Sequence, residues 1–244
     1  YGAYPFFEWW NERNYDIKAQ VIYKAAVDEE KEWLKENKRS RDILVIKQLL
    51  DQIQKLGYRY KYFVDITNRE NDDIELLKLL STYIGKFQDE YFSARIVEVI
   101  GKRGNVDFTE IILNHYNLLS NDDKRMHGAF YDNALSRIRD KRYLSNYIEL
   151  LKSTEDAKYL PLTMVMLGKW QTEVAKKVFL DYLNKYELYL NVPENRTLIF
   201  VSLESLSCYS DTDGVIMKTL EDILNVSDKD LQRATQKAIK AIKG

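Results

Sequence analysis

The sequence is poor in the residues that interrupt helices or cross-link a fold. Its 244 residues include only 9 Gly, 3 Pro, 1 Cys and 2 His. Gly and Pro together make about 5% of the chain, compared with roughly 12% in average proteins. Because a β-sandwich or barrel needs a turn every ~8–12 residues, this shortage favours long helices. The single cysteine, Cys208, excludes an internal disulfide and any cysteine-based zinc site, and it leaves the redox compartment open.

Strong net charge and long apolar runs are also missing. The formal charge is −1, from 37 basic and 38 acidic residues, which disfavours a dedicated nucleic-acid binder. No apolar run approaches 18 residues, and residues 1–20 lack the apolar core of a signal peptide. We therefore expect a soluble chain without a signal peptide, whose location stays unknown. Because it starts at Tyr1 and not at Met, we expect an excised domain or a processed or trimmed product.

The residues that are present indicate an ordinary globular chain built of repeated helices. The composition is 45% hydrophobic, and apolar residues recur with the 3.6-residue helical period from about residue 16 onward. The ends of five expected helices align on Gly101, Ser136, Gly168, Ser207 and Lys240. An acidic residue lies twelve or thirteen positions before each end: Asp89, Asp123, Asp156, Glu194 and Asp228. These helix ends are 32 to 39 residues apart, a period typical of stacked helix pairs.

Shorter apolar helices alternate with these aligned ones. We expect them at about 107–119, 143–152, 172–185 and 213–224. A helix at 72–84 pairs with 89–100 in the same way, so five pairs cover about 71–244, while 16–37 and 41–56 form a sixth, irregular pair. Residues 58–64 alternate at period two, and we interpret them as a connector or helix extension because an isolated strand is marginal. Pro161 either opens or kinks its helix.

The acidic start and the apolar–small ending of each unit resemble HEAT-type repeats. The residues that carry the resemblance are Asp89 to Ile100-Gly101, Asp156 to Leu167-Gly168, and Asp228 to Ile239, in repeats that cover about 70% of the chain. The period is shorter than the ~40–47 residues usual for the family. The family's basic residue in the second helix is replaced by Ser93, Leu160 and Ile199.

The resemblance implies an all-α, right-handed α-solenoid of about five to six antiparallel helix pairs. Residues 1–66 would form an N-terminal helical cap with the irregular first pair, and residues 67–244 the repeat array. The tetratricopeptide alternative has a fitting period of ~34 residues, but its Trp, Leu-Gly and Tyr signature is absent. Each helix pair cannot bury its apolar face alone, so stacking supplies the partner surface.

The search for chemistry finds no catalytic or metal motif. No phosphate-binding loop, dinucleotide fingerprint, HExxH or GxSxG motif occurs. His115 and His127 are twelve residues apart, too far for a pair of ligands on one helix face. The segment Asp211 to Gly214 fails two calcium-ligand positions and reads as a helix N-cap turn. We expect no metal, no cofactor and no catalytic residue within this chain, although an enzyme is not excluded.

The expected function is non-catalytic binding of a protein or peptide along the concave face of the array. The candidate contacts, one to three on each of three aligned helices, are Arg95, Glu98, Asp132, Asn133, Arg137 and Glu204. Residues 160–167 and 198–206 are apolar on nearly every side. Such helices are either covered by a tightly curled array or exposed as an apolar groove.

Basic residues follow several of the aligned helix ends. They are Lys102, Arg103, Arg139, Lys141, Arg142 and Lys169. One interpretation is a basic edge that suits an acidic or phosphate-bearing partner. The other is that these cations complement the macrodipoles at helix C-termini. We favour the second interpretation. The pattern fades in the last two repeats, where Cys208 and Ala241 take the position.

Other interpretations stay open. Some zinc aminopeptidases carry a helical C-terminal domain of this kind. If this chain is such a domain, it belongs to a larger enzyme. A HEAT-like DNA glycosylase is similar in length and repeat type, but it needs a basic groove that the net charge disfavours. The aromatic residues Phe6, Phe7, Trp9 and Trp10 either cap the first helix pair, which we favour, or dock an upstream domain.

Overall fold

The chain is all-α. The computed structural model describes residues 4–67 and 73–243, and for residues 4–17 it describes the backbone alone. These residues form fifteen α-helices and two 3-10 helices, with no strand among them. In the same residues, no helix combines the length and the apolar character that crossing a membrane requires. The fold divides into two compact units, unit 1 (Tyr1–Val99) and unit 2 (Ile100–Gly244). The boundary expected from the sequence between residues 66 and 67 marks the start of the repeat array, and it stays a prediction.

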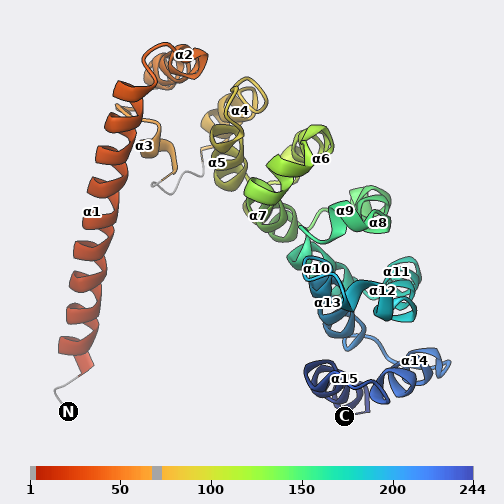
Figure 1. Cartoon of the computed structure of the whole chain (residues 1–244). Coiled ribbons are helices and arrows are strands. Elements are labelled where there is room, and N and C mark those ends of the chain that lie inside the picture. The colour runs from red at the N-terminus through yellow and green to blue at the C-terminus, as the bar shows by residue number, and fades with distance from the viewer. Residues whose placement is uncertain (1–3, 68–72, 244) are drawn as a thin grey trace. The chain divides into compact units, whose positions relative to one another are not determined.

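Unit 1 contains a long first helix followed by shorter ones (Figure 1). Its helices are α1 (Tyr4–Glu36), α2 (Arg41–Lys55), α3 (Val64–Thr67), α4 (Ile74–Ser81) and all but the last residue of α5 (Glu90–Ile100). The helix expected at 16–37 therefore begins at least twelve residues earlier, at Tyr4. The others start and end within three residues of their predicted limits. Residues 58–63 are neither helix nor strand, in agreement with their interpretation as a connector.

Aromatic side chains hold the centre of unit 1 together. Phe92 on α5 lies edge to face with Phe63 (ring centroids 5.0 Å apart) and with Trp33 of α1 (5.1 Å). Phe87 completes the cluster, 5.3 Å from Phe92 and 6.0 Å from Phe63. Phe63, Phe87 and Phe92 are buried. The aromatic connector therefore contributes Phe63 to the core that joins α1 to α5.

Two carboxylates of unit 1 bind the starts of other helices. Glu30 on α1 accepts hydrogen bonds from two consecutive backbone N–H groups at the start of α3, Phe63 (2.7 Å) and Val64 (2.9 Å). Asp42 on α2 accepts from Gln88 (2.7 Å) and Asp89 (3.0 Å), just before α5. The first N–H groups of a helix have no partner inside it, so each carboxylate satisfies two of them.

In unit 2, the helices expected at 107–119, 143–152, 172–185 and 213–224 appear within two residues of these limits. Its helices are α6 (Thr109–Leu118), α7 (Asn121–Ile138), α8 (Leu144–Lys152), α9 (Thr154–Ala157), α10 (Pro161–Trp170), α11 (Glu173–Asn184), α12 (Tyr186–Leu190), α13 (Arg196–Leu206), α14 (Val215–Leu224) and α15 (Lys229–Lys243). The 3-10 helices Val106–Phe108 and Lys141–Tyr143 precede α6 and α8. Pro161 occupies the first turn of α10, so it opens this helix and does not kink it.

The helices of unit 2 form two rows (Figure 1). In the row that we call the second-helix row, α7 contacts α10, α10 contacts α13, and α13 contacts α15. In the first-helix row, α8 contacts α11 and α11 contacts α14, with α6 on the same side. Contacts of α6 with α7, α11 with α13, and α14 with α15 join the rows. Fully buried aromatic side chains, among them Tyr116, Tyr131, Tyr147 and Phe179, fill the space between them.

Three of the five aligned acidic residues pair with a cation 32 to 36 residues earlier in the chain. Lys124 forms an ion pair with Asp156 (2.6 Å), and Arg196 forms one with Asp228 (2.7 Å). Lys158 lies 3.4 Å from Glu194 in the same arrangement. The partners are 32, 32 and 36 residues apart, close to the spacing of the aligned helices. Lys124, Lys158 and Arg196 each lie one or two residues after one aligned acidic residue and pair with the next aligned acidic residue along the chain. The spacing of the aligned acidic residues therefore matches these tertiary contacts.

Candidate functional site

The second-helix row exposes a face whose residues recur in aligned positions. Phe130 on α7, Leu162 on α10 and Val201 on α13 occupy the same aligned position. Each lies six residues before the aligned residue of its helix, which is Ser136, Gly168 or Ser207. Leu162 is 49% exposed, and Phe130 and Val201 are partly exposed. Because the three helices contact one another in succession, these side chains share one face.

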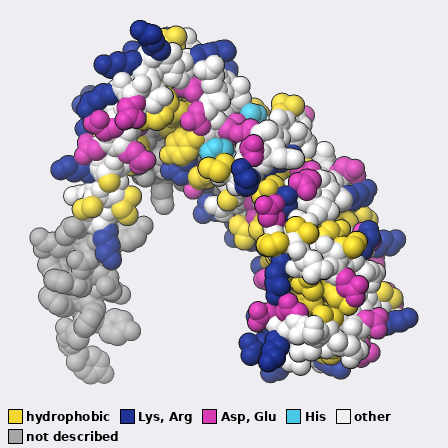
Figure 2. Space-filling view, viewed as in Figure 1, with side chains coloured by type: hydrophobic (Ala, Val, Ile, Leu, Met, Phe, Trp, Pro, Cys, Tyr) yellow, Lys and Arg dark blue, Asp and Glu magenta, His cyan; other side chains and the backbone are white. Residues whose placement is uncertain are grey.

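Two more apolar residues extend this set. Val165 is partly exposed one turn after Leu162 on α10, and Met126, near the start of α7, is 68% exposed. Figure 2 shows hydrophobic side chains between charged ones over the part of unit 2 that contains α10 and α13. We call Met126, Phe130, Leu162, Val165 and Val201 the apolar patch. In the sequence, the part of the apolar patch on α10 and α13 was indicated by residues 160–167 and 198–206, which are apolar on nearly every side.

Three of the expected contact residues border the apolar patch. Asn133 on α7 and Glu204 on α13 occupy the same aligned position as Val165, and Arg137 lies one turn after Asn133. Arg137 and Glu204 are exposed and Asn133 is partly exposed. Arg95 and Glu98 lie on α5 in the part that belongs to unit 1, where they form an ion pair with each other.

Asp132 is not an exposed contact residue, which corrects the expectation for this position. Its side chain is 2% exposed and turned toward the start of α10. The carboxylate accepts hydrogen bonds from the backbone N–H groups of Leu162 and Thr163, each at 2.8 Å. The residue before α10 is Leu160, which has no capping oxygen, and Pro161 has no N–H. Asp132 therefore caps α10 from the neighbouring helix.

Burial sets the protonation of this carboxyl group. Desolvation raises the pKa of Asp132 to about 6, and the hydrogen bonds from Leu162 and Thr163 oppose that rise without cancelling it. A carboxyl group with a pKa near neutral is common in catalytic sites. Here both oxygens are engaged by backbone N–H groups inside the fold, so the raised pKa follows from a capping role.

Two residues of the basic edge are used inside the chain. Arg142 forms an ion pair with buried Asp140 (2.8 Å), which lowers the pKa of that carboxyl group, and it donates to the carbonyl oxygen of Val106 (3.2 Å). Arg139 takes a left-handed conformation (φ 58°) at the end of α7, and its Nε donates to the carbonyl oxygen of Ser136 (3.2 Å). Arg139 fits the interpretation that cations satisfy helix C-termini, whereas Arg142 neutralises a buried carboxylate and binds the segment before α6.

The other basic residues are available to different degrees. Arg103 and Lys169 are exposed, and neither has an ion pair within the described residues. The Lys141 ammonium lies 5.7 Å from the centroid of the Trp170 ring, a cation–π contact between the turn after α7 and the end of α10. Lys102 is partly exposed and interacts within the chain.

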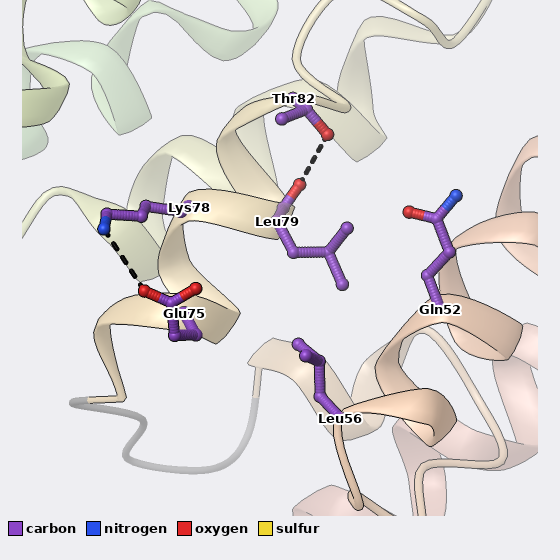
Figure 3. Close-up of a pocket in the computed structure, with 6 residues that line it drawn as sticks. All are labelled: Gln52, Leu56, Glu75, Lys78, Leu79 and Thr82. Carbon is purple, nitrogen blue, oxygen red and sulfur yellow. Dashed lines mark hydrogen bonds and ion pairs between the residues drawn. The ribbon is translucent and has the colours of Figure 1, made fainter.

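Unit 1 carries an open pocket of about 350 Å³ between α2 and α4 (Figure 3). Leu56 and Leu79 extend into it from opposite sides, and Gln52 and Thr82 line its rim. Its two charged residues, Glu75 and Lys78, form an ion pair one turn apart on α4 (3.2 Å). Because these charges neutralise each other outside the apolar centre, the pocket offers no acid–base pair for chemistry.

Within the described residues, no group of three or more His, Cys, Asp or Glu side chains is placed to hold a metal ion. The aromatic residues Phe6, Phe7, Trp9 and Trp10 lie on α1, but their side chains are outside the described residues. Comparisons with protein-family models, curated proteins and solved structures gave no match. Functional interpretation therefore depends on the geometry of this chain alone.

Proposed function

We propose that this chain is a non-catalytic binding protein of HEAT-like helix pairs, which holds a protein or peptide partner on the exposed face of α7, α10 and α13. The observation that carries the proposal is the row of Phe130, Leu162 and Val201, one apolar side chain from each of three successive helices. Single exposed apolar residues are ordinary, but a contiguous set bordered by polar ones is typical of interaction sites.

The dimensions of this row suit a short polypeptide segment. Packed helices lie ~8–10 Å apart, so three of them present anchors over roughly 20 Å. An extended chain covers that distance with about six residues. The polar border of Asn133, Arg137 and Glu204 then provides hydrogen-bonding groups around an apolar centre, as in protein interfaces.

The roles of the titratable groups support binding over catalysis. The described carboxylates with shifted pKa values all bind the start of a helix or take part in an ion pair. Those with a lowered pKa include Asp140 beside Arg142, Asp213 beside Lys176, and Asp228, which accepts from the Leu231 backbone N–H and from Arg196. Those with a raised pKa, Glu30 and Asp132, bind backbone N–H groups of neighbouring helices. Burial raises the pKa of the last two, and structural contacts lower the pKa of the others.

The test is a selection of random twelve-residue peptides displayed on phage against the immobilised chain, followed by affinity measurements on the enriched peptides. We expect the variant Leu162→Glu with Val201→Glu to bind them at least tenfold more weakly. The matched control is Leu118→Glu with Leu188→Glu. These leucines are 81% and 69% exposed and lie on α6 and α12, outside the second-helix row.

Equal binding by wild type, test variant and control variant contradicts the proposal, and so does the absence of any enrichment over bare support. Helical circular dichroism of every variant checks that the substitutions leave the fold intact. The two other classes, a helical domain of a zinc aminopeptidase and a HEAT-like DNA glycosylase, stay predictions. Salt-dependent affinity for duplex DNA at ~150 mM salt would favour the glycosylase.

A further inference from the structure

Two cations lie directly beside the apolar patch. Lys169 is one helical turn after Val165 on α10, and Arg137 is one turn after Asn133 on α7. Residues four apart on a helix lie on the same face. Each directly follows the aligned residue of its helix, Ser136 or Gly168, so they flank the patch on neighbouring helices at the same level.

These charges are not neutralised from within the fold. Neither Arg137 nor Lys169 forms an ion pair among the described residues, and both side chains are exposed. Two nearby carboxylates are used elsewhere, because Asp132 binds the start of α10 and Asp140 binds Arg142. The positive potential of this part of the face is therefore directed outward.

A third cation, Lys141, adds positive charge near the same part of the face. Lys141 belongs to the turn after α7, and its ammonium group lies over the ring of Trp170, the last residue of α10. This contact places positive charge between the C-terminal ends of the two helices. Arg142 and Arg139, by contrast, are engaged by Asp140 and by a backbone carbonyl group. The structure thus separates basic residues that serve the fold from those that face outward.

The charge reverses at the third helix of the row. On α13 the position equivalent to Lys169 is Cys208, and Glu204 occupies the position equivalent to Val165 and is exposed. The face is therefore basic beside α7 and α10, apolar along its centre, and acidic at α13. A partner that matches this face carries its negative charge at one end only.

We infer that the partner is an acidic, apolar peptide segment whose aliphatic or aromatic side chains cover the apolar patch and whose carboxylates lie over Arg137 and Lys169. This inference rests on the proposed function, because it names the chemistry of the partner for the same face. Complementary charge beside an apolar centre gives orientation and specificity, while the apolar contacts supply most of the affinity.

The experiment compares two peptide selections, one on the wild-type chain and one on Arg137→Glu with Lys169→Glu. We expect the wild-type pool to be enriched in Leu, Ile, Phe, Asp and Glu, with net negative charge. Peptides from that pool bind the charge-reversed variant about tenfold more weakly, and the difference shrinks at high salt because exposed charges are screened. The matched control reverses exposed lysines of the first-helix row, Lys177→Glu with Lys218→Glu, and leaves affinity unchanged.

The outcomes separate this inference from the proposed function. A neutral or basic pool that still depends on Leu162 and Val201 overturns the inference and leaves the proposed function standing. A pool whose binding is unchanged by substitution of Leu162 and Val201 and by reversal of Arg137 and Lys169 overturns both the inference and the proposed function. A labelled 20-base-pair DNA duplex is tested in parallel. Binding to it at ~150 mM salt that is lost on reversing Arg137 and Lys169 overturns the acidic peptide in favour of nucleic acid.

Discussion

A Cβ atom built on Gly168 of α10 would lie 2.7 Å from the Cα atom of Ser205 on α13. It would also lie 2.8 Å from the Ser205 carbonyl oxygen, so the nearest obstacles include backbone atoms that cannot rotate away. Both residues are buried. The two helices at the centre of the proposed binding face therefore pack backbone to backbone, and this approach exists only because residue 168 has no side chain.

Gly168→Ala is expected to destabilise unit 2. Alanine is favoured over glycine in a helix by about 1 kcal/mol, but overpacking against a backbone costs more, so we expect a net loss of about 1–3 kcal/mol. Urea unfolding followed by circular dichroism measures the loss. Gly128→Ala is the comparison, because its added Cβ would meet the Tyr159 Cβ at 3.1 Å, a contact that a shift of a few tenths of an ångström relieves. A variant as stable as wild type contradicts this account of the contact.

Asp132→Ala is expected to weaken the attachment of α10 to α7. The substitution leaves the partly buried N–H group of Leu162 and the buried N–H group of Thr163 without partners, and an unsatisfied buried group costs roughly 1–3 kcal/mol. We expect a total loss of about 2–5 kcal/mol in chemical unfolding. The neighbour Asn133→Ala serves as control and loses less than about 1 kcal/mol. Equal losses at the two positions would show that Asp132 does not cap α10.

The pH dependence of stability gives a separate test of the same carboxyl group. Its pKa is about 6 in the folded chain and 3.8 unperturbed, so the folded chain retains a proton that the unfolded chain loses between these values. The contribution of Asp132 is fully present below pH 3.8 and is lost as pH rises through 6. We expect the stability difference between wild type and Asp132→Asn to fall by about 3 kcal/mol across this range. A constant difference from pH 4 to 7 would contradict the raised pKa.

The ion pair between Lys124 and Asp156 is expected to matter more than an exposed pair. The two side chains are only 10% and 18% exposed, so Asp156→Ala leaves a largely buried cation, at a cost of roughly 3 kcal/mol. Glu149→Ala removes the partner of Lys152 in a pair with side chains 76% and 60% exposed, and we expect less than about 0.5 kcal/mol there. A double-mutant cycle on each pair measures the two couplings. Similar couplings would show that the Lys124–Asp156 pair contributes no more than an exposed one.

Much of the helical content follows from the sequence because its causes are local. The helices expected at 89–100 and 143–152 appear as α5 and α8, within one residue at each end. Apolar periodicity, the scarcity of Gly and Pro, and capping residues act over a few neighbours, so they can be read without the tertiary fold. The early start of α1 at Tyr4 was missed because residues before 16 show no clear apolar face.

The sequence pattern indicates which candidate residues share a helix face, but not the role of each residue. The aligned columns identify which residues recur on one helix face, and Asn133, Arg137 and Glu204 indeed border the apolar patch. Asp132 is next to Asn133 in sequence, but a helix turns by about 100° per residue, and that rotation points its carboxylate at α10. Whether an acidic side chain meets a partner or a neighbouring helix depends on this tertiary contact.

The sequence by itself determined that the chain is helical and that its helices recur about every 32 to 39 residues. Tertiary structure decided which of the recurring residues serve the fold. It paired Asp156, Glu194 and Asp228 with cations 32 to 36 residues earlier in the chain, and it left Arg137 and Lys169 facing outward. The reason is physical: helix formation depends on neighbours in the chain, whereas burial and charge pairing depend on residues about thirty positions away.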